Sequence, residues 1–319
     1  MKRWIVVLVA AALRSSALDA AEAQHKSLEI GYIENFDRGA DVYILKTGDT
    51  RRDVAVLAPV FDGDTIEVKD PSATITLRVV GEAGPRVLSK ANAVATITGR
   101  IPQKGFLSGV YAWTTSVVQL FDREQREQIS ASIRGNLGNL SGSQLSAPLL
   151  ARPQTVLAEK RKLIIGWVSP LIVDIRVLDG DGAPVASGRG SGTLWATPEV
   201  DWKPGAYAIE IAASGETLRQ SVQFVPPDKG PNLPAEFADP AAPEPLRAVA
   251  IGAWYAAEDP AFLLEALQHV APEAGSSRPA GLLAQAFTEG KRPSPQPPGK
   301  RSEGAGSRDL GALTSPSTR

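Results

Sequence analysis

The chain has 319 residues, enough for one to three domains with buried cores. Its 34 Lys and Arg balance 35 Asp and Glu, which excludes a broadly basic nucleic-acid-binding protein and an acidic, disordered chain. Because the sequence has no Cys and only two His, it excludes disulfides, Cys nucleophiles, thiolate metal ligands and sites with three His ligands. The 29 Gly and 25 Pro favour many turns and short strands over a helical bundle.

Residues 1–23 have the pattern of a secretory signal peptide. Two basic residues precede an apolar run from Trp4 to Leu13, and Ala21-Glu22-Ala23 is a small-x-small cleavage site. This run is too short for a membrane anchor, since spanning a bilayer takes about 20 apolar residues. We expect a mature protein that begins near Gln24, has no transmembrane segment and resides in the periplasm.

Residues 28–100 predict a first β unit. The segment Ala73 to Val79 alternates strictly between apolar and polar residues, and Asp64 to Val68 alternates in the same way. Turn signals such as Gly48-Asp49 and Asp62-Gly63-Asp64 separate the short apolar runs. This spacing favours a small β-sandwich, barrel or β-solenoid.

Residues 102–134 predict a helical connector. Apolar residues from Leu107 to Phe121 lie at helical spacing, and the polar run Asp122 to Gln128 extends the pattern. Four β-branched residues between Thr114 and Val118 lower the helix propensity. The sequence therefore leaves both helix and strand open for residues 104–121.

Residues 157–227 predict a second β unit. Six or seven short strands, joined by turns such as Asp179-Gly180-Asp181-Gly182, are typical of an immunoglobulin-like β-sandwich. We expect Trp167 and Trp195 to fill its core. Trp202 lies in a turn next to Lys203-Pro204 and is expected to be exposed.

Residues 245–290 predict a short helical hairpin that folds apart from the β units. The segment Leu246 to Ala257 is apolar on nearly every face, so it must be buried against another element. We expect Trp254 and Tyr255 to pack against the helix Phe262 to Val270. A Pro-rich linker at 228–245 is expected to separate this hairpin from the second β unit.

Residues 291–319 predict a disordered tail. They contain five Pro, five Ser and six Lys or Arg against two acidic residues, a net charge of 6 − 2 = +4. Such a tail is either a solvated linker or a contact for acidic envelope polymers.

The first β unit resembles the FecR-type domain. The resemblance lies in Gly39 to Leu45, Gly48, Val54 to Leu57 and Phe61 to Ile66, with Ala73 to Val79 in place of the family's alternating strand. It covers less than a quarter of the chain and implies an all-β envelope domain with a role in signalling. Signalling members have a cytoplasmic anti-sigma segment and a membrane span, whereas here a signal peptide is expected to lead straight into the domain.

No catalytic, cofactor-binding or metal-binding residue is predicted. The run Gly188 to Gly192 lacks the helix and the Lys of a phosphate loop, and is interpreted as a flexible β–β loop. The acidic turns Asp62 to Asp64 and Asp179 to Gly182 lack the other ligands of a calcium loop. His269 could act as a base, but neither a nucleophile elbow nor a zinc-binding His pair accompanies it.

The expected fold is mainly β: a FecR-like β domain, then an immunoglobulin-like β-sandwich, with short helices at the connector and C-terminus. The expected function is that of an exported, non-catalytic periplasmic module in envelope sensing or signalling. Its expected partner is a periplasmic or envelope protein or a cell-wall polymer, with no nucleic acid and no cofactor. Two alternatives stay open, a cell-envelope hydrolase that uses carboxylates, which sequence alone does not pair, and a structural envelope scaffold.

Overall fold

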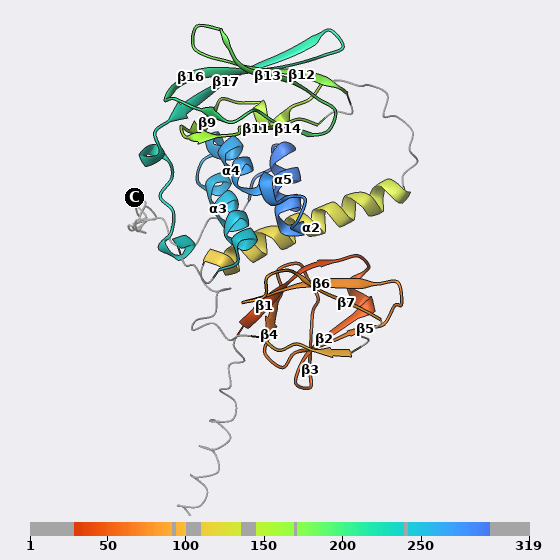
Figure 1. The fold of residues 1–319 in the computed structure, drawn as a ribbon. Coiled ribbons are helices and arrows are strands. Elements are labelled where there is room, and N and C mark those ends of the chain that lie inside the picture. The colour runs from red at the N-terminus through yellow and green to blue at the C-terminus, as the bar shows by residue number, and fades with distance from the viewer. Residues whose placement is uncertain are drawn as a thin grey trace, which may run out of the picture.

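The computed structural model describes residues 29–90, 94–99, 110–134, 145–168, 171–238 and 242–293. The structure is mainly β, with several antiparallel sheets and a layer of helices between two β units (Figure 1). The chain passes from the first β unit through a long helix to the second β unit. Its last three helices then return to lie beside that long helix. The predicted signal peptide and residues 294–319 of the predicted tail lie outside the described residues.

The first β unit consists of two four-stranded antiparallel sheets. Their strand orders are β4-β1-β6-β7 and β3-β2-β5-β8. The strands are β1 (Glu29–Phe36), β2 (Tyr43–Thr47), β3 (Thr50–Arg52), β4 (Pro59–Phe61), β5 (Thr65–Val68), β6 (Thr74–Val79), β7 (Arg86–Ser89) and β8 (Val94–Thr96). The predicted alternation of β6 is confirmed, because Ile75, Leu77 and Val79 are buried in the core.

The turn Asp62-Gly63-Asp64 has a structural role in this unit. Gly63 has a φ of 83°, which an L side chain rarely adopts. The fully buried Asp64 carboxylate accepts hydrogen bonds from Thr47 Oγ1 (2.6 Å), Arg52 Nη1 (2.9 Å) and the Phe61 backbone N–H (2.9 Å). Asp64 thereby ties β2, β3 and β4 together.

The second β unit contains a five-stranded sheet of order β13-β12-β16-β17-β9 and two short ribbons, β10-β15 and β11-β14. Strand β9 runs parallel to β17, and the other pairs are antiparallel. The strands are β9 (Gln154–Leu157), β10 (Lys160–Arg161), β11 (Ile164–Gly166), β12 (Val173–Leu178), β13 (Pro184–Gly190), β14 (Leu194–Ala196), β15 (Val200–Asp201), β16 (Gly205–Ala213) and β17 (Glu216–Val225).

The glycine-rich run belongs largely to strand β13, so its interpretation as a flexible loop is wrong. A Cβ added at Gly188 would clash with Cζ2 of Trp195, and one added at Gly190 would clash with Cη2 of Trp167. Both glycines leave room for indole rings. Trp167 is fully buried, as predicted, and Trp195 is partly buried against the core.

The prediction that Trp202 is exposed is also wrong. Its side chain is 2% exposed, and its ring stacks on Phe224 with centroids 4.9 Å apart. The edge of Tyr207 contacts the same ring, and Trp202 Nε1 donates to the Arg161 carbonyl at 3.0 Å. The turn directs the indole into the core, where its only polar atom has a partner.

The helical layer contains four α-helices among the described residues, α2 (Val110–Arg134), α3 (Glu244–Glu258), α4 (Leu263–Val270) and α5 (Arg278–Thr288). The ambiguity over residues 104–121 is resolved in favour of a helix from Val110 onward. Val117, Val118 and Phe121 are buried on α2, so tertiary packing outweighs their β propensity. No helix in the described ranges is both long enough and apolar enough to cross a membrane.

The C-terminal helices differ from the two-helix hairpin expected at 245–290. Tyr255 contacts Phe262 as predicted, but Trp254 packs on Trp113 of α2 and on Phe237 of the expected linker. Helix α4 also contacts β9. The expectation of an independent hairpin is therefore wrong, because these apolar helices are buried against α2 and the second β unit.

The start of the predicted tail is ordered. Arg292 Nε donates to the Ala256 carbonyl at 2.8 Å, and Arg292 Nη2 donates to the Ala257 carbonyl at 3.3 Å. Arg292 thus binds free carbonyl groups at the end of α3, where a cation is favourable.

Candidate functional site

A polar cleft lies where the first β unit meets the helical layer. Strand β1 lies between β4 and β6 in its sheet and also contacts α5. The pairing register shifts between Ile33 and Asn35, which leaves Glu34 as the extra residue of a β-bulge. Bulges redirect side chains and occur next to functional sites. Glu34 is 2% exposed and lines the cleft together with residues of α2 and α5.

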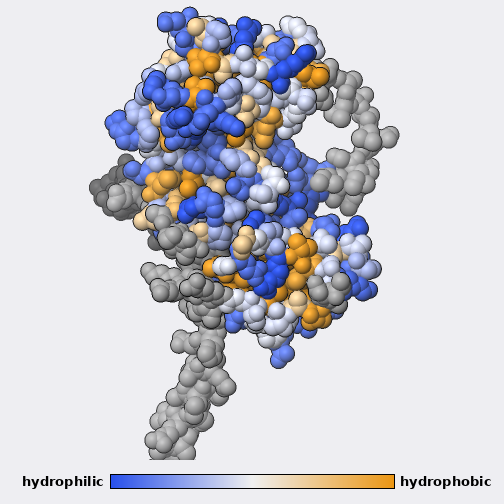
Figure 2. Space-filling view, viewed as in Figure 1, coloured by the Kyte–Doolittle hydropathy of each residue, from blue (hydrophilic) through white to orange (hydrophobic). Residues whose placement is uncertain are grey.

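The cleft has a volume of about 480 Å³, within the range of about 300–1,000 Å³ that small-molecule sites occupy. Its polar lining comes from β1, β6, α2, α5 and the turn before α5. Figure 2 shows hydrophilic residues gathered on the helical layer around α5 and α2. The residues with polar side chains that line it are Glu34, Asn35, Thr76, Gln125, Ser276, Ser277, Arg278 and Gln285.

Two ion pairs frame the cleft. Glu34 Oε2 accepts a hydrogen bond from Arg78 Nε at 2.9 Å, and Arg278 Nη2 donates to Asp122 Oδ1 of α2 at 2.7 Å. Asp122 also pairs with Arg126, whose guanidinium lies 4.4 Å from the ring centroid of Phe36 in β1. The charged groups therefore join the first β unit, α2 and α5 across the cleft.

Four polar atoms of the cleft lining are buried without a hydrogen-bond partner. They are Glu34 Oε1, Asn35 Oδ1, Ser277 Oγ and Arg278 Nε. Leaving such an atom unpaired costs about 1–3 kcal/mol, so most buried polar groups in proteins are satisfied. Four at one cleft indicate a place where a ligand or ordered water supplies the missing partners.

Burial raises the pKa of the Glu34 carboxyl, and the hydrogen bond and charge of Arg78, together with a smaller contribution from the Ser277 hydroxyl, only partly oppose that shift. A perturbed carboxyl in a cleft is one mark of a functional site. The sequence contains one signal for it, a Glu that directly follows the run Ile30 to Ile33, which has no charged residue. Ser277 and Arg278 give no such signal, since they are remote from Glu34 in the chain.

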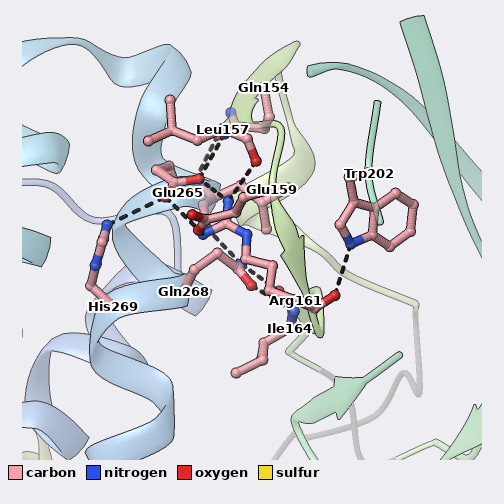
Figure 3. Close-up of polar contacts among 10 residues, drawn as sticks. Gln154, Leu157, Glu159, Arg161, Ile164, Trp202, Glu265, Gln268 and His269 are labelled. Carbon is pink, nitrogen blue, oxygen red and sulfur yellow. Dashed lines mark hydrogen bonds and ion pairs between the residues drawn. The ribbon is translucent and has the colours of Figure 1, made fainter. Parts of the chain in front are cut away.

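A second polar network joins α4 to the second β unit (Figure 3). Glu265, fully buried in α4, accepts hydrogen bonds from the Leu157 backbone N–H and Arg161 Nη1, both at 2.9 Å. Arg161 Nη2 donates to Glu265 Oε2 and to the Leu157 carbonyl. His269 Nε2 lies 3.3 Å from Glu265 Oε1 without hydrogen-bond geometry.

Burial raises the pKa of Glu265, but His269 and Arg161 outweigh burial and lower it to about 2. Two glutamines complete the connection. The Gln268 side chain accepts a hydrogen bond from the Ile164 N–H (2.7 Å) and donates one to the Ile164 carbonyl (2.8 Å), as the backbone of a neighbouring strand would. The Gln154 side chain accepts a hydrogen bond from the Leu264 N–H (2.9 Å). Arg161 Nε and His269 Nε2 have no hydrogen-bond partner among the described residues, but both oxygens of Glu265 and the side-chain amides of both glutamines are engaged, so we interpret the network as structural.

The residues weighed from the sequence lie elsewhere. Asp179 Oδ1 accepts from the backbone N–H groups of Asp181 (3.0 Å) and Ala183 (2.8 Å), which is the geometry of a hairpin turn. His269 stacks on Tyr255 with centroids 5.1 Å apart. Within the described residues, no three His, Asp or Glu side chains come together as a metal site would require.

In comparisons with known proteins, no family model matches the sequence and no curated protein matches it. The resemblance to the FecR-type domain stays a prediction from sequence.

Proposed function

We propose that this chain is an exported, non-catalytic, FecR-like periplasmic module that binds an envelope component in the cleft between its first β unit and helical layer. The convergence of the four unpartnered atoms of Glu34, Asn35, Ser277 and Arg278 carries this proposal. The signal-peptide pattern of residues 1–23 supports export. The role that follows is envelope sensing or signalling through a bound protein or polymer.

The architecture supports the finer assignment of the two β units. We assign the first, with its eight strands in two sheets, to a FecR-like domain and the second to an immunoglobulin-like sandwich. The Gly63-Asp64 turn carries much of the resemblance to the FecR-type domain. Its Asp64 carboxylate holds three strands of the first β unit together.

Binding fits the cleft better than hydrolysis. A hydrolase with paired carboxylates needs two acidic side chains about 5–10 Å apart. Among the described residues that line the cleft, Glu34 is the one carboxylate, and Arg78 already occupies one of its oxygens. The alternative of a purely structural scaffold leaves the unpartnered atoms unexplained.

Co-sedimentation with isolated cell envelopes tests this proposal. Gln285 has an exposed side chain on α5 and lines the cleft, so Gln285→Trp should fill its entrance without disturbing the core. Gln223→Trp, at an exposed position on β17, is the matched control. The wild-type mature chain and the control should sediment alike, and Gln285→Trp should stay in the supernatant. Equal sedimentation of all three proteins would contradict the proposed function.

A further inference from the structure

The charges of the cleft are balanced within the protein. Two charged residues line it in the described structure, and each has an oppositely charged partner: Arg78 for Glu34 and Asp122 for Arg278. A site for an anion or a cation would present an uncompensated charge. The lining therefore matches a neutral ligand better than an ion.

The unpartnered atoms of the cleft include both donors and acceptors. Asn35 Oδ1 accepts, Arg278 Nε donates, and the Ser277 hydroxyl can do both. Glu34 Oε1 accepts as a carboxylate oxygen. Hydroxyl groups, which donate and accept at the same atom, satisfy such a mixed set.

Ser277 supplies an independent observation. It occupies the N-cap position of α5, where a serine oxygen ordinarily accepts a backbone hydrogen bond, yet its side chain makes no capping bond. The residue is 2% exposed, and its hydroxyl lines the cleft near the Glu34 carboxyl without forming a hydrogen bond of good geometry. The hydroxyl is therefore open to a ligand in the cleft rather than used by the helix.

We propose that this cleft binds a neutral, hydroxyl-rich ligand, namely a short segment of glycan. This inference rests on the proposed function, because it names the ligand class of the same site. Asn35, Ser277 and Arg278 provide direct hydrogen bonds to glycan hydroxyl or amide groups. Pro85 and Leu282 provide the apolar part of the lining, which suits the C–H faces of a sugar ring.

Calorimetric titration of the mature protein with neutral trisaccharides tests the ligand class. The probes are chitotriose, cellotriose and maltotriose, and inorganic phosphate serves as the anionic comparison. We expect at least one trisaccharide to bind with a dissociation constant of about 1 mM or tighter, and phosphate not to bind. Ser277→Ala should weaken that binding by about three- to tenfold, the effect of one hydrogen bond, and Gln285→Trp should abolish it.

The control variant is Ser187→Ala, at an exposed position on β13, which should bind like the wild type. If none of the three trisaccharides binds, or if phosphate binds in their place, the glycan inference is wrong. Binding that Ser277→Ala and Gln285→Trp both leave unchanged would equally overturn it.

Co-sedimentation with cell envelopes distinguishes failure of the glycan inference from failure of the proposed function. If trisaccharides do not bind but Gln285→Trp still prevents sedimentation, the cleft binds a different component and the proposed function stands. Sensitivity of that sedimentation to protease treatment of the envelopes would identify the component as a protein. If sedimentation is also unaffected by Gln285→Trp, both proposals are wrong.

Discussion

Three buried carboxylates differ in how many of their oxygens have hydrogen-bond donors. Both oxygens of Asp64 and both of Glu265 are occupied by backbone, hydroxyl or guanidinium groups. Glu34 has a donor, Arg78, on one oxygen and none on the other. A fully satisfied buried carboxylate specifies the fold, whereas a half-satisfied one is unfavourable unless a ligand or water completes it.

Glu265 makes the free energy of unfolding depend on pH in the acidic range. Its pKa falls from the ordinary value of 4.5 to about 2 on folding. The unfolded chain therefore binds the proton first, so the stabilising contribution is present above about pH 4.5 and is lost as the pH falls toward 2. Between pH 3 and 6, the free energy of unfolding measured in urea should rise less steeply with pH for Glu265→Gln than for the wild type. Identical slopes for the two proteins would contradict this role.

Two capping positions allow a matched comparison. Asp259 Oδ1 accepts from the Ala261 N–H at 2.8 Å, whereas Ser277 makes no such bond. Asp259→Ala should lower the free energy of unfolding by about 1 kcal/mol, and Ser277→Ala by less than about 0.5 kcal/mol. Chemical denaturation measures both. A cost for Ser277→Ala as large as that for Asp259→Ala would mean that its hydroxyl supports the fold.

At the scale of elements, local pattern predicts much of the structure. The alternation of Ala73 to Val79 marks β6, and the apolar spacing through Phe121 marks the body of α2, although β-branched residues left a strand possible. Trp202 was mispredicted because a turn residue can direct its side chain inward. The cleft could not be predicted, because it depends on a bulge at Glu34 and on α5, far along the chain, packing against β1.

Strand β13 offers a test of side-chain packing against glycine. A Cβ at Gly190 would clash with the ring of Trp167, which is fully buried. Gly190→Ala should therefore destabilise the protein by about 1–3 kcal/mol through overpacking. Gly192→Ala is the control, because nothing lies within 4 Å of the added Cβ. Thermal unfolding should separate the two variants, and equal melting temperatures would refute the packing argument.

At the scale of the whole molecule, the helical layer joins the two β units. Helix α2 contacts α3 and α5, α5 contacts β1, and α4 contacts β9. The Gln119 side chain of α2 also donates to the Val56 carbonyl of the first unit at 3.1 Å. The C-terminal helices thus complete an assembly whose two β units lie on opposite sides of the layer (Figure 1).

Trp254→Ala probes this assembly. The ring is 8% exposed and packs edge-on against Trp113 of α2 and Phe237, so its loss should cost about 3–5 kcal/mol. Because the layer contacts both β units, we expect wild type and variant to unfold in one transition when followed by circular dichroism and by fluorescence. A separate early transition of the helices, with unchanged melting of the β units, would show that the layer is an independent unit.

We propose that the cleft between the first β unit and α5 is the binding site of this protein. A photo-crosslinking amino acid placed at Gln285 in living cells tests it most directly, with the same group at Gln223 on the second β unit as the control. We predict a crosslinked adduct from position 285 that is absent at position 223 and is lost when Arg278→Ala and Asn35→Ala are combined in the same chain. An adduct only at position 223, or equal adducts at both positions, would contradict the claim.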